Sequence, residues 1–338
     1  MSEPRASRTS PRLPVAASVV VVILIVATGL LFLRHASPSR AAAGDTLTVG
    51  DQRGGAQALL AAAGELDNLP YRIDWALFPA AAPLLEALSA GAVDVGGVGS
   101  APFAFAYASG AHIRAVYAYR AADGAGRASA VIVRRDSPLR TVADLKGKKV
   151  ATIRGSAGQN LVLRLLEQAG LKASDVEWVY LANGESKAAL GTGAIDAWST
   201  WGSCVGIALL EDGDRVLADG TGLSKDVGFF AANDGALTAK RAILADFVQR
   251  LSRAKTWAQQ HPRDYAAVLA RETGLPFRVA LFAITSNLGS TVPIDDRLVA
   301  EQVRIFERYR RAGVIAAVPD IRGGYDPIFN RGSEPAVR

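Results

Sequence analysis

Three polar side chains near the middle of the chain stand where an anion could be bound. Ser156, Gln159 and Asn160 follow a short run of β-branched residues and open an apolar run with helical spacing over 161–170. The pattern S-x-x-Q before such a run is typical of a helix N-terminus. The first turn of a helix presents unpaired backbone N–H groups and the positive end of the helix dipole, and both attract anions. Residues 147–170 therefore predict a strand that enters a helix, with an anion site at the junction.

Ser156 itself has two possible roles at this junction. If its hydroxyl caps the helix, it accepts a backbone N–H of the first turn and is not free for a ligand. The amides of Ala157 and Gly158 then become the donors, with the side chains of Gln159 and Asn160 as further candidates. Arg53, which follows the first expected strand, could add a positive charge and a bidentate hydrogen bond. The alternative for Arg53 is a solvated surface position, since most arginines are exposed.

Strands and helices alternate along the chain. Strand-like runs are found at 47–50, 71–75, 94–99, 112–120, 129–135, 150–153, 178–180, 196–201 and 227–233, and helical patterns dominate later, at 242–260, 265–272, 277–286 and 296–311. Such alternation predicts an α/β fold with parallel sheets, whose loops gather at the carboxyl edge where ligands bind.

The strand pattern restarts after residue 128, which indicates a second lobe. We expect residues 44–128 to form the first part of lobe 1 and residues 129–228 to form lobe 2. Residues 229–338 are expected to return to lobe 1 and to end in helices.

The N-terminus is typical of a targeting segment. Residues 14–33 carry no charge and follow a start that contains three arginines, and Ala41 and Ala43 supply the small residues of an A-x-A cleavage site. Residues 1–43 are therefore interpreted as a signal peptide that is removed on export. The apolar run is also long enough to span a bilayer, so an uncleaved membrane anchor is the alternative.

Composition excludes several classes of function. The formal charge is +6, but without residues 1–43 the chain holds 33 basic and 31 acidic residues and shows no basic stripe with interleaved aromatics. A nucleic-acid partner is therefore not expected. Cys204 is the only cysteine, so no internal disulfide can form, and a small buried residue is a better interpretation than a nucleophile. No metal-ligand spacing, nucleophile elbow or Walker loop is present, so we expect no metal, no cofactor and no enzymatic activity.

Four motifs follow one another in a specific order. They are F-P-A-x-x-P-L-L-E-A-L-x-A-G-x-V-D-V-G at 78–96, G-x-G-S-A-P at 97–102, S-P-L-x-x-x-x-D-L-K-G-K-K-V-A at 137–151 and G-A-I-D-A-W-x-x-W at 193–201. With them the chain resembles, over 46–310, the solute-binding proteins of ABC importers for nitrate, alkanesulfonates and taurine, a group that also includes thiamine-pyrimidine binders.

The resemblance implies a two-lobed periplasmic-binding-protein fold of type II. Two α/β domains joined by two hinge crossings would close on a small anion in the cleft and present it to an ABC transporter permease with its ATPase. The protein would act as a monomer in the periplasm or at the cell surface, either free or anchored by residues 14–33.

The resemblance also names the loops that would contact the ligand. The candidates in lobe 1 are Gln52, Arg53, Pro79, Ala80, Gly99 and Ser100, and those in lobe 2 are Ser156, Ala157, Gly158, Gln159, Asn160 and Trp201. One departure stands beside the last of these, because Gly202 and Ser203 replace the Asp-Pro that often follows this tryptophan in the family.

Two other functions remain open at this point. The same fold could bind an aromatic heterocycle, such as a thiamine pyrimidine, or an aromatic carboxylate. Its stacking surfaces would be Phe103, Trp198, Trp201 and Phe230. The chain could also be a membrane-anchored ligand sensor, if residues 14–33 stay in place.

Overall fold

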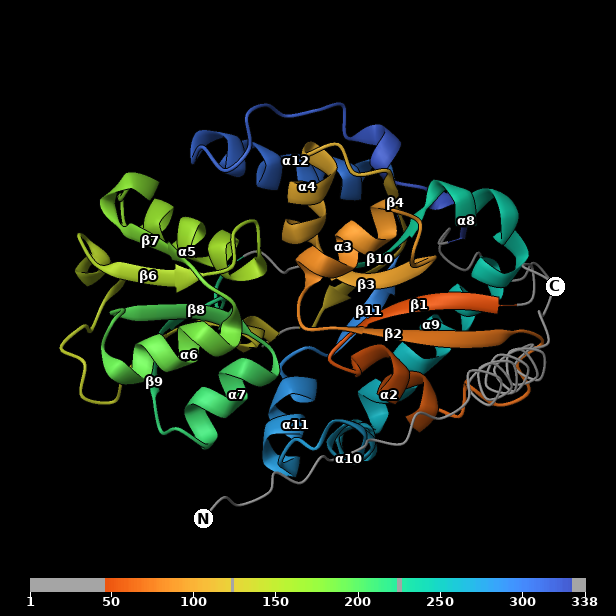
Figure 1. The fold of residues 1–338 in the computed structure, drawn as a ribbon, viewed down its shortest axis with the longest axis horizontal. Helices are drawn as coiled ribbons and strands as arrows, with labels where there is room; N and C mark the ends of the chain where they lie inside the picture. The colour runs from red at the N-terminus through yellow and green to blue at the C-terminus, as the bar shows by residue number, and fades with distance from the viewer. Residues whose placement is uncertain (1–45, 123–124, 224–226, 330–338) are drawn as a thin grey trace, which may run out of the picture. The chain divides into compact units, whose positions relative to one another are not determined.

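The computed structural model describes residues 46–122, 125–223 and 227–329, which build two separate sheets (Figure 1). The first sheet has the strand order β11-β4-β10-β3-β1-β2, and the second has the order β7-β6-β8-β5-β9. The chain crosses from the first sheet to the second between β4 and β5, and returns between β9 and β10. Each sheet with its helices forms one lobe, which is called a layer below. Two such α/β layers joined by two crossings are the fold class that the sequence predicts.

The first sheet combines parallel and antiparallel strands. It contains β1 (Thr46–Gln52), β2 (Arg72–Phe78), β3 (Val95–Gly99), β4 (Ile113–Ala121), β10 (Val227–Asn233) and β11 (Gly289–Val292), and its first strands are joined by α2 (Gly55–Ala62), α3 (Ala81–Ser89) and α4 (Ser100–Ala108). β1 pairs in parallel with β2 and β3, whereas β10 is antiparallel to both β3 and β4. The expected parallel pairing is found among β1, β2 and β3, whereas β10, which enters from the second sheet, runs the opposite way.

The second sheet follows the same plan. Its strands are β5 (Ser129–Val133), β6 (Lys149–Thr152), β7 (Glu177–Tyr180), β8 (Ala197–Trp201) and β9 (Arg215–Asp219), and its helices are α5 (Ala157–Gln168), α6 (Asn183–Thr192) and α7 (Ser203–Leu210). β6 is parallel to β7 and β8, and β5 is antiparallel to β8 and β9. The carboxyl ends of β6 and β8 lead directly into α5 and α7.

The remaining helices follow β10. They are α8 (Asp234–Ala239), α9 (Arg241–Gln260), α10 (Pro262–Thr273), α11 (Phe277–Thr285) and α12 (Asp296–Arg311), with short 3-10 turns at Ala125–Ala128, Val142–Leu145, Ala173–Asp175, Arg322–Gly324 and Pro327–Phe329. The bounds of α12 agree with the predicted helix. Its N-terminus is marked by Asp295, whose carboxylate accepts the Leu298 amide at 2.8 Å.

Helices cover both faces of the first sheet. On one face α2, α9 and α10 pack against Leu47, Val49 and Phe230, and on the other α3, α4 and α12 pack against Val98 and Phe229. All seven residues of β10 are buried, which explains why this strand is a nearly unbroken apolar run in the sequence.

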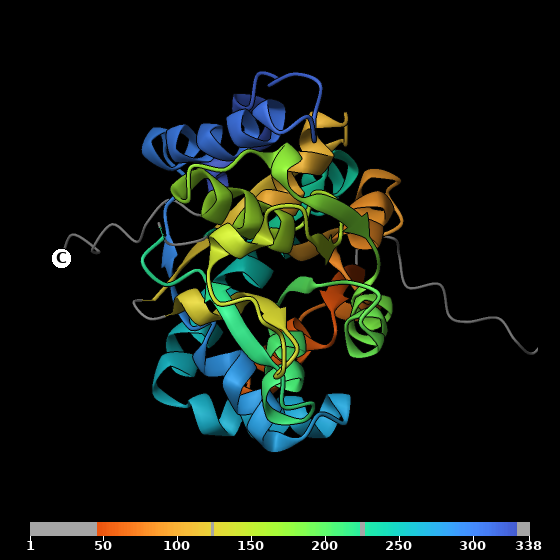
Figure 2. The same ribbon diagram turned by 90° about the vertical axis from the view of Figure 1, so that its left-hand side faces the viewer.

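Two of the late helices also reach the second layer. α12 packs against α4 and α5, and α11 packs against α7. In Figure 2, where the second sheet's layer faces the viewer, α12 lies above it and α11 below it.

Residues 14–33, the expected signal or anchor segment, lie outside the described residues. Among the helices that the structure does describe, none is long and apolar enough to cross a membrane.

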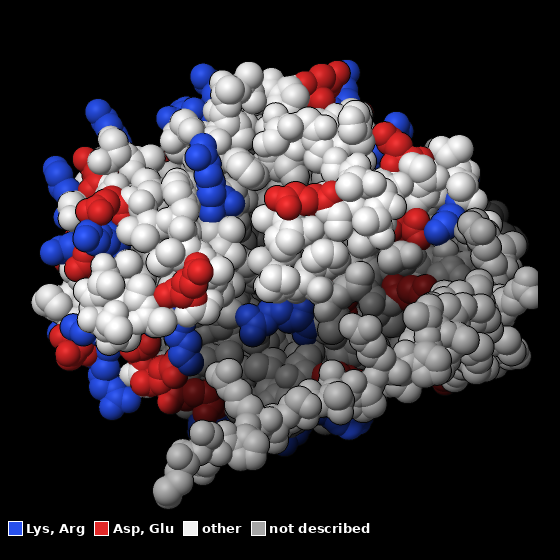
Figure 3. All heavy atoms as spheres, in the orientation of Figure 1, with Lys and Arg blue, Asp and Glu red and all other residues white. Residues whose placement is uncertain are grey.

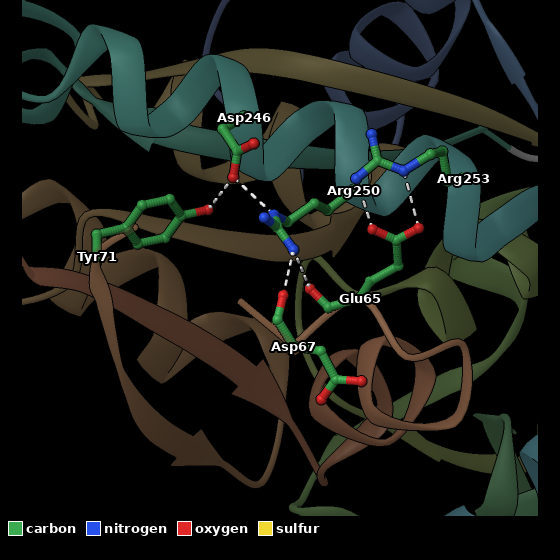
Figure 4. Close-up of polar contacts among 6 residues, drawn as sticks. All are labelled: Glu65, Asp67, Tyr71, Asp246, Arg250 and Arg253. Carbon is green, nitrogen blue, oxygen red and sulfur yellow. Dashed lines mark hydrogen bonds and ion pairs between the residues drawn. The ribbon is translucent and has the colours of Figure 1, made fainter. Parts of the chain in front are cut away.

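A polar network ties α9 to the loop between α2 and β2 (Figure 4). Arg250 donates to the Asp246 carboxylate at 2.7 Å and to the backbone carbonyls of Glu65 and Asp67 at 2.8 and 3.2 Å. The Tyr71 hydroxyl donates to the same Asp246 carboxylate at 2.9 Å. Burial, followed by the carboxylate, raises the pKa of Tyr71 well above its ordinary value, so the phenol remains a donor.

Replacing Arg250 by Met is expected to destabilise the protein by about 2 kcal/mol. The change removes three hydrogen bonds of a largely buried arginine and leaves the partly exposed Asp246 carboxylate without its cation. Urea unfolding followed by circular dichroism measures the effect. Arg72→Met, which breaks the exposed ion pair with Asp74, is the control and should shift stability by less than about 0.5 kcal/mol. Equal effects of the two variants would contradict the role given to the network.

Candidate ligand-binding cleft

A cleft of about 820 Å³ lies between the two layers, at the carboxyl ends of their parallel strands. Its walls come from the loops after β1, β2 and β3 on one side and after β6 and β8 on the other. Lys and Arg atoms are visible in the hollow at the centre of the face drawn in Figure 3. The basic residues that line the cleft are Arg53, Arg154 and Lys255.

The N-terminus of α5 is built as the sequence predicts. Ser156 is the N-cap, and its hydroxyl accepts the Gln159 amide at 3.2 Å. The Gln159 side chain reaches back to accept the Gly155 amide at 2.7 Å, one residue before the cap. The Ser156 hydroxyl is therefore engaged by the helix, and among the described residues no acceptor meets the amides of Ala157 and Gly158.

Gly155 brings this junction into contact with the first layer. Its φ of +71° lies in the left-handed region, and a Cβ placed on it would lie 2.3 Å from Cγ of Phe105 on α4. On the other side, the Tyr309 hydroxyl of α12 donates to the Ser156 carbonyl at 2.9 Å. The anion-binding end of α5 is thus held between two helices that pack on the first sheet.

The helix starts around the cleft differ in how their amides are satisfied. At α2, the Asp51 carboxylate accepts the amides of Ala56 and Gln57 at 3.0 and 2.8 Å. Burial raises the pKa of Asp51, against the lowering effect of these backbone bonds. The first turns of α5 and α7 contain no acidic residue. A ligand oxyanion can supply at those two helices the acceptor that the protein itself supplies at α2.

The start of α7 reflects the departure seen in the sequence. Gly202 occupies its N-cap with φ 59° and ψ −131°, a backbone conformation that is essentially restricted to glycine, and no side chain caps the helix. Trp201, Gly202 and Ser203 all line the cleft. Where an aspartate would cap this helix with its own charge, the chain leaves the amides open to the cleft.

Arg53 spans the cleft. Its Nη1 donates to Sγ of Cys204, which lies in the first turn of α7, at 3.0 Å. Arg53 also has a positive φ of 58°, and its amide donates to the Phe78 carbonyl at 3.2 Å. The guanidinium therefore lies beside the open start of α7, where it can add charge to the amides.

Comparison with known proteins places this geometry in a family. A family model described as NMT1/THI5 like matches residues 77–265. The chain is also 32% identical over 305 residues to the aliphatic sulfonates-binding protein of Escherichia coli (strain K12), across 89% of this chain and 95% of that protein. The chain belongs to the NMT1/THI5-like family. These relatives are described as binding proteins, in agreement with the prediction that the chain is not an enzyme.

Solved structures of the family share the fold over nearly their whole length. The alkanesulfonate-binding protein SsuA from Xanthomonas axonopodis pv. citri, bound to MOPS, superposes with a TM-score of 0.76 at 29% identity, covering 85% of this chain and 99% of that one. The periplasmic aliphatic sulphonate-binding protein SsuA from Escherichia coli gives 0.73 at 32% identity, covering 87% and 96%. The two-lobed periplasmic-binding-protein fold is thereby confirmed.

The structure brings most of the candidate residues of this NMT1/THI5-like protein to one cleft. Those that line it are Gln52, Arg53, Pro79, Ala80, Gly99, Ser156, Ala157 and Trp201. Ser100, Gly158, Gln159 and Asn160 are not part of its wall. Nε2 of the Gln159 side chain donates to the Tyr180 hydroxyl at 2.9 Å, and Oδ1 of Asn160 accepts from Arg308 at 3.2 Å, so both side chains are held by residues outside the cleft wall.

The aromatic surface of the cleft differs from the one that the sequence indicated. Phe103 and Trp198 are buried in the cores of their layers, and only Trp201 and Phe230 of the four expected aromatics line the cleft. Phe105, Tyr119 and Tyr265 line it as well and were not expected. The described residues contain no group of three His, Cys, Asp or Glu side chains that could hold a metal ion.

Substituting Gly155 by Ala tests the contact between α4 and the α5 junction. We expect a loss of about 2–4 kcal/mol, from the positive φ and from the clash with Phe105 together. Gly170→Ala is the matched control, because Gly170 has nearly the same φ of +70° but open space around it. Urea unfolding of both should show a smaller loss for Gly170→Ala. Adding Phe105→Ala to Gly155→Ala should recover part of the steric cost, and no recovery would contradict the contact.

Proposed function

We propose that this protein is the substrate-binding component of an ABC importer and captures a small organic sulfonate in the cleft between its lobes. One observation carries the proposal. Two helices, α5 and α7, begin at the same cleft without an acidic residue in their first turns, and the Arg53 guanidinium lies at the start of α7. Hydrogen-bond donors of both lobes therefore meet at the start of α7. The carboxylate of Asp51 does not compete for them, because it accepts the amides of the first turn of α2.

The chemistry of a sulfonate suits these donors. A sulfonate presents three acceptor oxygens and carries its charge at every physiological pH, so it needs N–H groups and no proton acceptor. The amide of Ala157, the amides at Ser203 and Cys204, and Arg53 can meet those oxygens from both lobes. The organic part of the ligand would pack on Trp201, Phe105 and Phe230. The related proteins that are described as sulfonate binders support this ligand class.

Closure of the cleft would couple capture to transport. We propose that residues 44–128 with 229–338 move as one lobe and residues 129–228 as the other, about the crossings between β4 and β5 and between β9 and β10. Contacts between the layers favour the closed form, among them the bidentate pair of Arg278 on α11 with Glu211 beside α7, at 2.8 Å for both bonds. The permease with its ATPase would recognise the closed form.

Residues 1–43 are proposed to direct export and to be removed, which places a monomeric protein in the periplasm. The periplasmic location of a related sulphonate-binding protein supports this compartment. A mature N-terminus near Gly44 would confirm it, whereas a chain that starts at residue 1 in isolated membranes would favour an anchored receptor.

Calorimetric titration of residues 44–338 tests the ligand class. Ethanesulfonate, butanesulfonate and taurine are expected to release heat and to raise the melting temperature, while butyrate, with a single carboxylate on a similar chain, should bind at least tenfold more weakly. Benzoate and a thiamine pyrimidine serve as the aromatic alternatives. Binding of these with no response to any sulfonate would overturn the proposal in favour of an aromatic ligand.

Arg53→Gln is expected to weaken butanesulfonate binding about 10- to 100-fold, because it removes a charge-assisted hydrogen bond inside the cleft. The same titration measures it. Arg297→Gln removes an arginine whose side chain is 89% exposed on α12 and should leave the affinity within twofold of the wild type. A loss below threefold for Arg53→Gln would place the sulfonate elsewhere in the cleft.

A further inference from the structure

Lys255 is a cationic side chain on the apolar face of α9. It shares this face with Leu251, Ala254 and Ala258, which are buried against the first sheet. Its Nζ lies 3.8 Å from the centroid of the Tyr119 ring on β4. Lys255 lines the main cleft and also a side pocket of about 40 Å³ that it shares with Tyr265 and Asn287. A lysine at this place faces the interior of the cleft.

Within the part of the chain that the structure describes, the side chain of Lys255 has no ion pair and no hydrogen bond. Its neighbours on α9 differ from it, since Arg250 pairs with Asp246 and Arg253 pairs with Glu65. Among the described residues, the attractive partner of the Lys255 ammonium group is the face of the Tyr119 ring. A methionine would fill the same space without the cost of desolvating a charge.

Among Lys255 and the ionisable groups that face it, Lys255 is the one that carries a positive charge. Burial lowers the pKa of Lys255 to about 8, so roughly nine-tenths of it is protonated at pH 7. Burial raises the pKa of both facing phenols, Tyr119 on β4 and Tyr265 on α10, so both are neutral. The acidic group that acts on Tyr265 is Asp51, whose oxygens are engaged by the start of α2.

The sheet separates the strand under Lys255 from the strand that leads to Arg53. The strands lie in the order β4, β10, β3, β1. Tyr119 on β4 pairs with Gly228 on β10, and Gly228 pairs with Gly99 on β3. β3 in turn pairs with β1. A Cβ on Gly228 would lie 2.2 Å from Cζ of Tyr119, so this glycine allows the ring to lie over β10. Three strand spacings, about 14 Å, separate the backbones of β4 and β1. Arg53 and Lys255 therefore line one cleft from different elements, the loop after β1 and helix α9.

We propose that Lys255 forms a second anion subsite, and that the ligand is an organic sulfonate with a second anionic group at its far end, either a sulfonate or a carboxylate. This inference rests on the proposed function for the first anion, which binds at Arg53 and the starts of α5 and α7. The second anion takes the place of the missing partner of Lys255, and the spacer between the two groups spans the cleft.

A matched pair of probes tests the subsite. Hexane-1,6-disulfonate and hexane-1-sulfonate have the same chain and differ only in the second anion. By calorimetry the wild type is expected to prefer the disulfonate about tenfold. Lys255→Met should reduce that preference to below twofold while hexane-1-sulfonate binds as before, which shows that the cleft is still formed. Lys146→Met, at an exposed position of lobe 2, should keep the full preference.

Protonation gives a second, independent readout. An anion beside Lys255 raises the pKa of Lys255. At pH 8, binding of the disulfonate should therefore be accompanied by the uptake of at most about half a proton by Lys255. Titrations in two buffers of different ionisation enthalpy measure this uptake. Hexane-1-sulfonate and the Lys255→Met variant should show none. Equal uptake for both probes, or a preference that survives Lys255→Met, would overturn the inference.

Octanedioate and octanoate separate this inference from the proposed function, because they carry the same six-carbon spacer with carboxylates. If no sulfonate binds but octanedioate is preferred in a manner that depends on Lys255, the sulfonate proposal fails and the second subsite stands. If neither pair of probes depends on Lys255, the subsite is refuted, whether or not hexane-1-sulfonate binds.

Discussion

Backbone N–H groups at helix starts need acceptors, and the cleft of this protein depends on where those acceptors come from. Desolvated amides that remain unpaired cost free energy, so each helix start beside the cleft must be capped by the chain or by a ligand. At α2 the chain provides Asp51, and at α5 it provides the Ser156 hydroxyl for one amide only. At α7 it provides nothing, because glycine stands at the N-cap. The starts of α3 and α4 at the cleft wall have no side-chain cap either. What distinguishes α7 is the Arg53 guanidinium beside its first turn, which adds positive charge there.

The packing between the layers keeps these helix starts close together. The Phe105 ring of α4 packs against the Cα of Gly155. Val279 and Phe282 of α11 pack in the same way against Gly206 of α7. In both places the absence of a Cβ on the second layer lets a helix of the first layer approach. The contacts lie on the two sides of the cleft, so they set the angle at which α5 and α7 face Arg53.

Much of the fold could be predicted from the sequence, since its signals are local. The helix at 296–311 has a cap residue and a strong amphipathic period, and the strand at 227–233 is a continuous apolar run. β9 and β11 were missed, because strands of five and four residues at sheet edges carry little alternation. The antiparallel entry of β10 also depends on a crossing between lobes, which no local pattern reports.

The site could be predicted less completely, for geometric reasons. The sequence located the junction at 147–170, but the rotation of α5 decides which side chains face the cleft, and it turns Gln159 and Asn160 toward Tyr180 and Arg308. The contact of Arg53 with Cys204 joins residues 151 positions apart and leaves no trace in the sequence. Lys255 did leave one, as a charged residue on the apolar stripe of a helix.

The place of β10 has a consequence for how the protein folds. This strand lies between β3 and β4, yet more than a hundred residues separate it from either of them along the chain, and the whole second sheet intervenes. Until β10 is in place, β3 and β4 both present unpaired edges, and the first layer cannot complete its sheet. The strands β1 to β4 therefore cannot complete their sheet before β10 has been synthesised. Such non-local pairing is intrinsically slow, so the first layer is expected to complete its sheet only after β10 has been synthesised.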